Sequence, residues 1–166
     1  MVSTEDVKRL RDETGAGVMD AKRALDEAGG NFDQARDILR EQGIAAAAKR
    51  ADRETGQGIV EAYIHGQGRI GALVEVQCET DFVARTDAFR ALAREVAMQV
   101  AAMSPVALTP EEVPEDQATN REEQALMTQA FIRDGSKTVQ DLVQEVIAQT
   151  GENIRIARFA RFELGR

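Results

Sequence analysis

The chain has 166 residues, 43% of them apolar and 30% charged, which suits one domain or two small ones with a real core. The net charge of −8 argues against a protein that wraps nucleic acid, because binding a polyanion requires a basic face. No apolar run approaches the ~18–20 residues that span a bilayer, and Met1–Leu10 lacks the apolar core of a signal peptide. We therefore expect a cytoplasmic protein without membrane contact.

Residues 3–43 have the pattern of three short helices. Ser3 with Asp6 forms a helix-starting pair, glycines at 15, 17, 29 and 30 separate the helices, and Asn31 caps a third helix that we expect to end at Gly43. Such a bundle lies near the ~40-residue limit for unaided folding, so it is an appendage or an interaction module. Residues 44–54 are rich in alanine and charge, which favours a helical connector. We assign 1–54 to this module with its connector.

Residues 55–166 predict an α+β core, a small antiparallel sheet packed on helices. Two alternating runs, 59–65 and 69–78, read as a hairpin. After the hairpin we expect a helix from Thr80 or Asp81 to about Met103 and then an acidic, proline-containing linker at 104–119. A helix within 120–129 and a turn at 133–136 should follow. The last expected elements are a helix from Thr138 to Gly151 and a strand at 154–164.

The closing strand has one irregular position. A regular two-residue period places Ile154, Ile156, Ala160, Phe162 and Leu164 on one face, and Arg158 interrupts that face. Either a bulge changes the register of the strand, or the arginine meets a carboxylate or a partner.

The stretch Glu75–Arg85 marks the point where strand spacing gives way to helix spacing. Thr80 stands as a helix N-cap and Asp81 as a first-turn carboxylate favoured by the helix dipole. Phe82 lies outside the apolar stripe of the helix that follows. The ring is either tucked under the sheet or presented to something else.

No constellation for catalysis or metal binding is present in the sequence. The single histidine, His65, sits at a hairpin end, and the single cysteine, Cys78, lies on an apolar strand face, so neither forms a ligand cluster or a nucleophile pair. Asp81 and Asp87 fit helix-start solvation better than an acid–base pair. The phosphate-binding glycine–lysine motif is absent. These observations favour a binding protein without a cofactor over an enzyme.

Three segments carry a resemblance to one family. Leu10–Leu25, Glu75–Arg85 around Thr80-Asp81-Phe82-Val83, and the closing segment Gly151–Gly165 resemble the two signatures and the last strand of the elongation factor Ts family, the guanine-nucleotide exchange factors of bacterial translation. The three segments occur in the order that the family has, and only Ser104 to about Gln124 has no recognisable counterpart.

The resemblance implies a ubiquitin-associated-like three-helix module at the N-terminus and elongation factor Tu as the partner. It implies that Asp81 and Phe82, within the motif Thr80–Val83, insert near the magnesium and phosphate region of that partner. It further implies contacts through Arg11, Val18 and Met19 and through Gly151. Short members of the family can act as homodimers, in which a second copy supplies missing surface.

The sequence departs from the family pattern at four positions: Val18, Gln77, Ala130 and Ala157. These departures concern single contacts. A second hypothesis from the residues alone is an adaptor whose three-helix module binds a ubiquitin-like or peptide partner, with the α+β domain as a scaffold. In that case residues 1–54 carry the binding, and Asp81 and Phe82 are silent.

Overall fold

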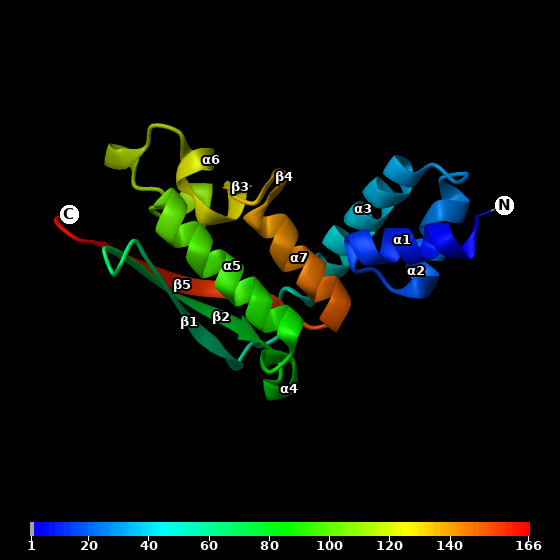
Figure 1. The fold of residues 1–166 in the computed structure, drawn as a ribbon, viewed down its shortest axis with the longest axis horizontal. Helices are drawn as coiled ribbons and strands as arrows, with labels where there is room; N and C mark the ends of the chain where they lie inside the picture. The colour runs from blue at the N-terminus through cyan, green and yellow to red at the C-terminus, as the bar shows by residue number, and fades with distance from the viewer. Residues whose placement is uncertain (1) are drawn as a thin grey trace. The chain divides into compact units, whose positions relative to one another are not determined.

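Figure 1 shows the fold as a computed structural model that describes residues 2–166. Helices come first and a small antiparallel sheet follows, so the predicted α+β class is confirmed. The chain forms two compact units. One comprises the chain up to Arg53 together with Gln144–Asn153, and the other comprises Glu54–Val143 and Ile154–Arg166.

The first unit contains the three predicted N-terminal helices, α1 (Thr4–Thr14), α2 (Val18–Glu27) and α3 (Phe32–Arg50). The Ser3 hydroxyl accepts a hydrogen bond from the Asp6 backbone N–H at 3.0 Å, and the Asp6 carboxylate accepts one from the Ser3 N–H at 3.2 Å. This reciprocal pair satisfies two N–H groups that a helix start leaves open. The helices share a small apolar core of Val7, Leu10, Ala21, Ala24, Leu25 and Ala35, with Phe32, Ile38 and Leu39 packed against it.

The third helix is longer than predicted. The expected end at Gly43 is wrong, because α3 continues through Gly43 and the alanine-rich segment to Arg50. A glycine inside a helix costs only ~1 kcal/mol relative to alanine, and the good helix formers after it offset that cost. The predicted connector is therefore part of the same helix.

The first unit also includes the end of α7 (Val139–Thr150). The Gln149 side chain covers Gly15, where a Cβ atom would clash with the Gln149 amide. Gly15 also has a left-handed φ of 69° and closes α1. Asn153 is 6% exposed, and its amide donates to the carbonyls of Ala51 at 3.2 Å and Arg53 at 2.9 Å.

The second unit is built on a three-stranded antiparallel sheet with the order β1-β2-β5. The hairpin of β1 (Gln57–His65) and β2 (Ile70–Cys78) agrees with the prediction, and β5 (Ile154–Glu163) pairs with β2. Helix α5 (Asp87–Met103) packs on one face of this sheet (Figure 1). Buried side chains from β2 and α5 form the layer between them: Ala72, Val74, Val76, Cys78, Phe89, Leu92, Ala93, Val96, Ala97 and Val100.

A bulge at Ala157 changes which side of the sheet the later side chains of β5 face, compared with the regular strand that was predicted. Val76 pairs with Ile156 but Glu75 pairs with Arg158, so Ala157 has no partner in the ladder. The extra residue turns Ala160, Phe162 and Leu164 to the side away from α5, where Phe162 is 73% exposed. The predicted common face of these three with Ile154 and Ile156 is wrong. Both explanations offered for Arg158 hold, since it follows the bulge and also pairs with the Glu75 carboxylate.

The acidic segment after α5 is folded into single turns. These are η1 (Pro110–Glu112), η2 (Glu115–Gln117), α6 (Arg121–Gln124) and η3 (Leu126–Thr128). The Arg121 guanidinium donates to the carbonyls of Pro110 at 3.1 Å and Val113 at 2.7 Å, which holds the segment together. The helix expected within 120–129 is thus a single α-turn followed by a 3-10 turn.

A short hairpin leads into α7. It consists of β3 (Ala130–Phe131) and β4 (Asp134–Thr138), so a strand begins within the turn expected at 133–136. The predicted cap at Thr138 is confirmed: its hydroxyl accepts from the Asp141 N–H at 3.2 Å, and the Asp141 carboxylate accepts from the Thr138 N–H at 2.8 Å. Buried Gln99 links α5 to this hairpin, because its amide donates to the Ala130 carbonyl and accepts from the Ile132 N–H.

Candidate functional site

The strand-to-helix corner, residues 78–87, is closed by two threonine caps. Thr80 is extended, and its hydroxyl accepts from the Val83 N–H at 3.3 Å to start the one-turn helix α4 (Asp81–Ala84). The Thr86 hydroxyl donates to the Val83 carbonyl at 2.7 Å and accepts from the Phe89 N–H at 3.3 Å, which starts α5. The prediction of one helix from residue 80 to 103 is therefore wrong at Thr86. A threonine hydroxyl competes with the helix ladder for backbone groups and here begins a new helix.

The two sides of α4 differ sharply in burial. Val83 and Ala84 are 5% and 6% exposed and anchor the turn, whereas Phe82 is 77% exposed. The ring that fills the core is instead Phe89, which is fully buried. The open question about Phe82 is thereby answered: its ring lies outside the core. A large exposed aromatic ring on a well-fixed turn is typical of a contact residue.

Asp81 and Arg85 lie beside Phe82 on the outer side of α4. Arg85 Nη2 is 3.0 Å from Asp81 Oδ2, one helical turn apart, and both side chains are more than half exposed. Asp81, Phe82 and Arg85 together form what we call the outer triad. Sequence reasoning missed Arg85, although its spacing of four residues from Asp81 was a readable signal.

The N-terminal candidates flank the loop between α1 and α2. Arg11 lies exposed in the last turn of α1, and its carbonyl accepts the Gly15 N–H at 2.7 Å. Val18 and Met19 open α2 and are 54% and 65% exposed, whereas Leu25 at the other end of the same helix is buried. The structure thus brings Arg11, Val18 and Met19 to the two ends of one loop.

Gly151 closes helix α7. Its N–H donates to the Ile147 carbonyl at 2.8 Å, and its φ of 71° lies in the left-handed region that favours glycine. The conformation explains the residue type at this position. Gly151 and the loop between α1 and α2 belong to the first unit, and the outer triad belongs to the second.

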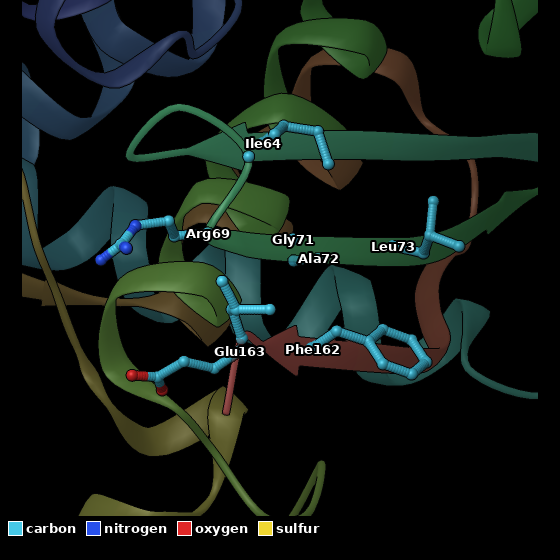
Figure 2. Close-up of a pocket in the computed structure, with 9 residues that line it drawn as sticks. Ile64, Arg69, Gly71, Ala72, Leu73, Phe162 and Glu163 are labelled. Carbon is cyan, nitrogen blue, oxygen red and sulfur yellow. The ribbon is translucent and has the colours of Figure 1, made fainter. Parts of the chain in front are cut away.

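The sheet has an open face, the side away from α5, which sequence reasoning did not identify. Five large apolar side chains on it are each at least 46% exposed: Val60, Ile64, Leu73, Phe162 and Leu164. A hollow of about 450 Å³ is lined by four of them, Ile64, Leu73, Phe162 and Leu164 (Figure 2). Gly71 lines it, and a Cβ atom there would lie 3.1 Å from Ile64 Cδ1. If the bulge at Ala157 is included, the two-residue period of the apolar side chains in β5 predicts this face.

Across residues 2–166, no three His, Cys, Asp or Glu side chains gather in a way that could hold a metal ion. His65 is stacked on Tyr63 with ring centroids 6.0 Å apart, and Cys78 is buried, so both are accounted for by packing. None of the helices in this range is long and apolar enough to cross a membrane.

Comparison with known proteins identifies the family. The family model described as "Elongation factor TS" matches residues 45–131, more than half of the chain. The elongation factor Ts of Caldanaerobacter subterraneus subsp. tengcongensis is 49% identical over 99% of this chain and 98% of its own length. The chain belongs to the elongation factor Ts family. Other elongation factor Ts relatives are those of Leptospira biflexa, 46% identical over 99% of this chain and 98% of its own, and of Rubrobacter xylanophilus, 47% identical over 96% and 97%.

Membership in the elongation factor Ts family makes the protein a translation elongation factor, a component of protein biosynthesis. The resemblance read from three sequence segments is thereby confirmed at the level of the family. The alignment with the Caldanaerobacter protein spans 195 positions against 166 residues in this chain. Because the alignment is longer than this chain, the Caldanaerobacter protein carries residues that have no counterpart here.

Proposed function

We propose that the protein binds elongation factor Tu and promotes release of its GDP, so that GTP can bind, by inserting Asp81 and Phe82 near the nucleotide and magnesium site. The observation that carries this proposal is the corner itself. Phe82 is 77% exposed while its neighbours Val83 and Ala84 are buried, so the ring is held outward on a fixed backbone. A ring presented in this way can enter a partner without first leaving a core of its own.

Such exchange requires no catalytic residue and no cofactor. A protein that binds the nucleotide-free partner more tightly than the GDP-bound one weakens GDP binding by the same factor. The protein is in this view not an enzyme. It acts in the cytoplasm, where translation takes place, and without direct contact to nucleic acid or membrane.

The energy of exchange has to come from several contacts. A thousandfold loss of nucleotide affinity corresponds to ~4 kcal/mol, and burying one phenylalanine contributes ~1.5–3 kcal/mol. Phe82 alone is therefore insufficient. Asp81 adds a carboxylate, which would repel phosphate oxygens or compete for a magnesium ion.

The remaining binding energy would come from the N-terminal module and the end of α7. Val18 and Met19 expose apolar surface at the start of α2, and Arg11 presents a cation at the end of α1. Thr80 and Val83 would act through the corner, as cap and as anchor. Gly151 would allow close approach of a partner, because no atom lies within 4 Å of the position that its Cβ would take.

Release of a fluorescent GDP analogue from elongation factor Tu tests the proposal. The wild type should accelerate release, and Phe82→Ala should reduce the acceleration by about ten- to a hundredfold, the equivalent of one buried ring. Ile132→Ala removes another exposed apolar side chain and should leave release unchanged. No acceleration by the wild type, or full acceleration by Phe82→Ala, would refute the insertion.

The adaptor hypothesis makes the opposite prediction for the full chain. Met19→Ala would weaken binding of a ubiquitin-like or peptide partner, while Asp81→Ala and Phe82→Ala would have no effect on any binding measured. If both corner variants bind elongation factor Tu as the wild type does, the adaptor hypothesis is favoured.

We further propose that two copies associate through the open face of the sheet. Four of its five large apolar side chains line a hollow, and Gly71 leaves room there for a side chain from a second copy. An apolar patch of this kind is unusual on a monomer, and a two-fold dimer places the same patch on both copies.

Sedimentation equilibrium tests the dimer. We expect a mass near twice 18.2 kDa for the wild type and close to 18.2 kDa for Leu73→Asp, which places a charge in the middle of the face. Val106→Asp, at an exposed position outside the face, should remain dimeric. A monomeric wild type at all concentrations up to tens of micromolar would exclude this dimer.

A further inference from the structure

Arg85 is a positively charged residue within a segment whose other charged residues are acidic. Between Arg69 and Arg90 it is the only cation in the sequence, whereas Glu75, Glu79, Asp81 and Asp87 are acidic. Its guanidinium nevertheless points back along α4, where Nη2 lies 3.0 Å from Asp81 Oδ2. The single positive charge of the corner is thus placed on the carboxylate that the proposed function sends toward an anionic nucleotide site.

The fold gives this pair a defined geometry. Arg85 is the C-cap of α4, and its backbone N–H donates to the carbonyls of Phe82 and Val83. Because Val83 and Ala84 are buried and Thr80 and Thr86 cap the two helices, the backbone from which Asp81 and Arg85 project is fixed. The carboxylate and the guanidinium are one turn apart on the same side of the helix.

The pair is too exposed to serve stability. The Arg85 and Asp81 side chains are 74% and 63% exposed, and ion pairs at such positions contribute little to folding. The effect of this pair therefore lies in where the carboxylate points.

We propose that Arg85 is a positioning residue for Asp81. It holds the carboxylate on the outer side of α4 in the free protein. This inference rests on the proposed exchange function, because the role of Asp81 does. Removal of Arg85 leaves the carboxylate free to rotate.

A double-mutant cycle on nucleotide release from elongation factor Tu tests the proposal. Release rates are measured against the concentration of the full chain for the wild type, Arg85→Ala, Asp81→Ala and the double variant. Arg85→Ala should lower the rate constant at low concentration about three- to fivefold, the most that an exposed ion pair of this kind can contribute. In the Asp81→Ala background the same change should alter it less than twofold, because nothing remains to be positioned.

Three comparisons separate positioning from a general effect of charge or stability. Arg85→Lys should recover most of the lost rate, because a lysine at the same spacing still reaches the carboxylate. Arg90→Ala removes a neighbouring cation of α5 and should change the rate less than twofold. The loss in Arg85→Ala should grow smaller at high salt, as expected for a screened charge, while its melting temperature stays within about 2 °C of the wild type.

Two results would overturn the inference while the exchange function stands. One is an Arg85→Ala variant as active as the wild type. The other is an equal loss with and without Asp81, which would mean that Arg85 contacts the partner by itself. A wild type that fails to accelerate release would overturn the exchange function and this inference together.

Discussion

Arg158 Nε lies 2.6 Å from Glu75 Oε2, and the two residues are strand partners at the first position of β5 after the bulge. The Gln77 amide donates to the other Glu75 oxygen at 2.7 Å. The hydrogen bond from Arg158, followed by that from Gln77, lowers the pKa of Glu75 below its usual value of 4.5. The bulge thus places Arg158 where it can form an ion pair with the Glu75 carboxylate on the central strand.

The first prediction concerns the pH dependence of this pair. Because the pKa of Glu75 is lower in the folded state, its ionised form stabilises the fold above pH 4.5, and the gain is lost as pH falls through the lowered value. The melting temperatures of wild type and Glu75→Gln should therefore differ at pH 6 and converge toward pH 3. In an Arg158→Gln background, the same comparison should show a smaller difference at every pH. A gap that widens on acidification would contradict this account.

The second prediction compares two phenylalanines. Phe89→Ala empties a fully buried site and should lower the free energy of unfolding by about 3–5 kcal/mol. Phe82→Ala removes a ring that is 77% exposed and should change it by less than about 0.5 kcal/mol. Urea unfolding measures both. Equal losses would mean that Phe82 is packed in solution.

The third prediction concerns the two caps of the corner. Thr80→Ala and Thr86→Ala should each cost about 1 kcal/mol, since each removes the oxygen that accepts a helix-start N–H. Serine at either position should restore most of the loss. If the corner has to be rigid, Thr80→Ala should also slow GDP release from elongation factor Tu, and Thr80→Ser should not.

The fourth prediction concerns deletions in β5. Deleting Ala157 removes the unpaired residue and leaves Arg158 opposite Glu75 and Phe159 opposite Val74, so every later side chain keeps its face. We expect a loss below about 1.5 kcal/mol. Deleting Ala160 instead shifts the residues that follow it and turns Phe162 toward α5, which should cost about 3 kcal/mol or more. Thermal unfolding measures the loss of stability in the two variants, and equal losses would contradict the prediction.

Much of the fold was readable from local patterns. The capping pair at Ser3 and Asp6, the hairpin of β1 and β2, and the cap at Thr138 depend on neighbouring residues and were predicted correctly. The continuation of α3 through Gly43 was not, because a glycine that ends one helix is tolerated in another when strong helix formers follow.

The errors at the site have a common cause in longer-range geometry. The phase of β5 depends on where a bulge falls against β2, and no spacing within residues 154–164 specifies Ala157 as that position. The helix break at Thr86 depends on a hydrogen bond from the Thr86 hydroxyl to the Val83 carbonyl. The sequence does not determine whether Phe82 is buried; its ring is 77% exposed on a turn whose next two residues, Val83 and Ala84, are buried.

The double cap of the corner has a thermodynamic consequence for any complex that it forms. Both helix starts are already hydrogen-bonded in the free chain, through Thr80 and Thr86, so docking orders no new backbone there. The heat-capacity change of association should then follow the apolar area covered, mainly the Phe82 ring and its surroundings. It should lack the additional heat-capacity change that accompanies a loop folding on its partner.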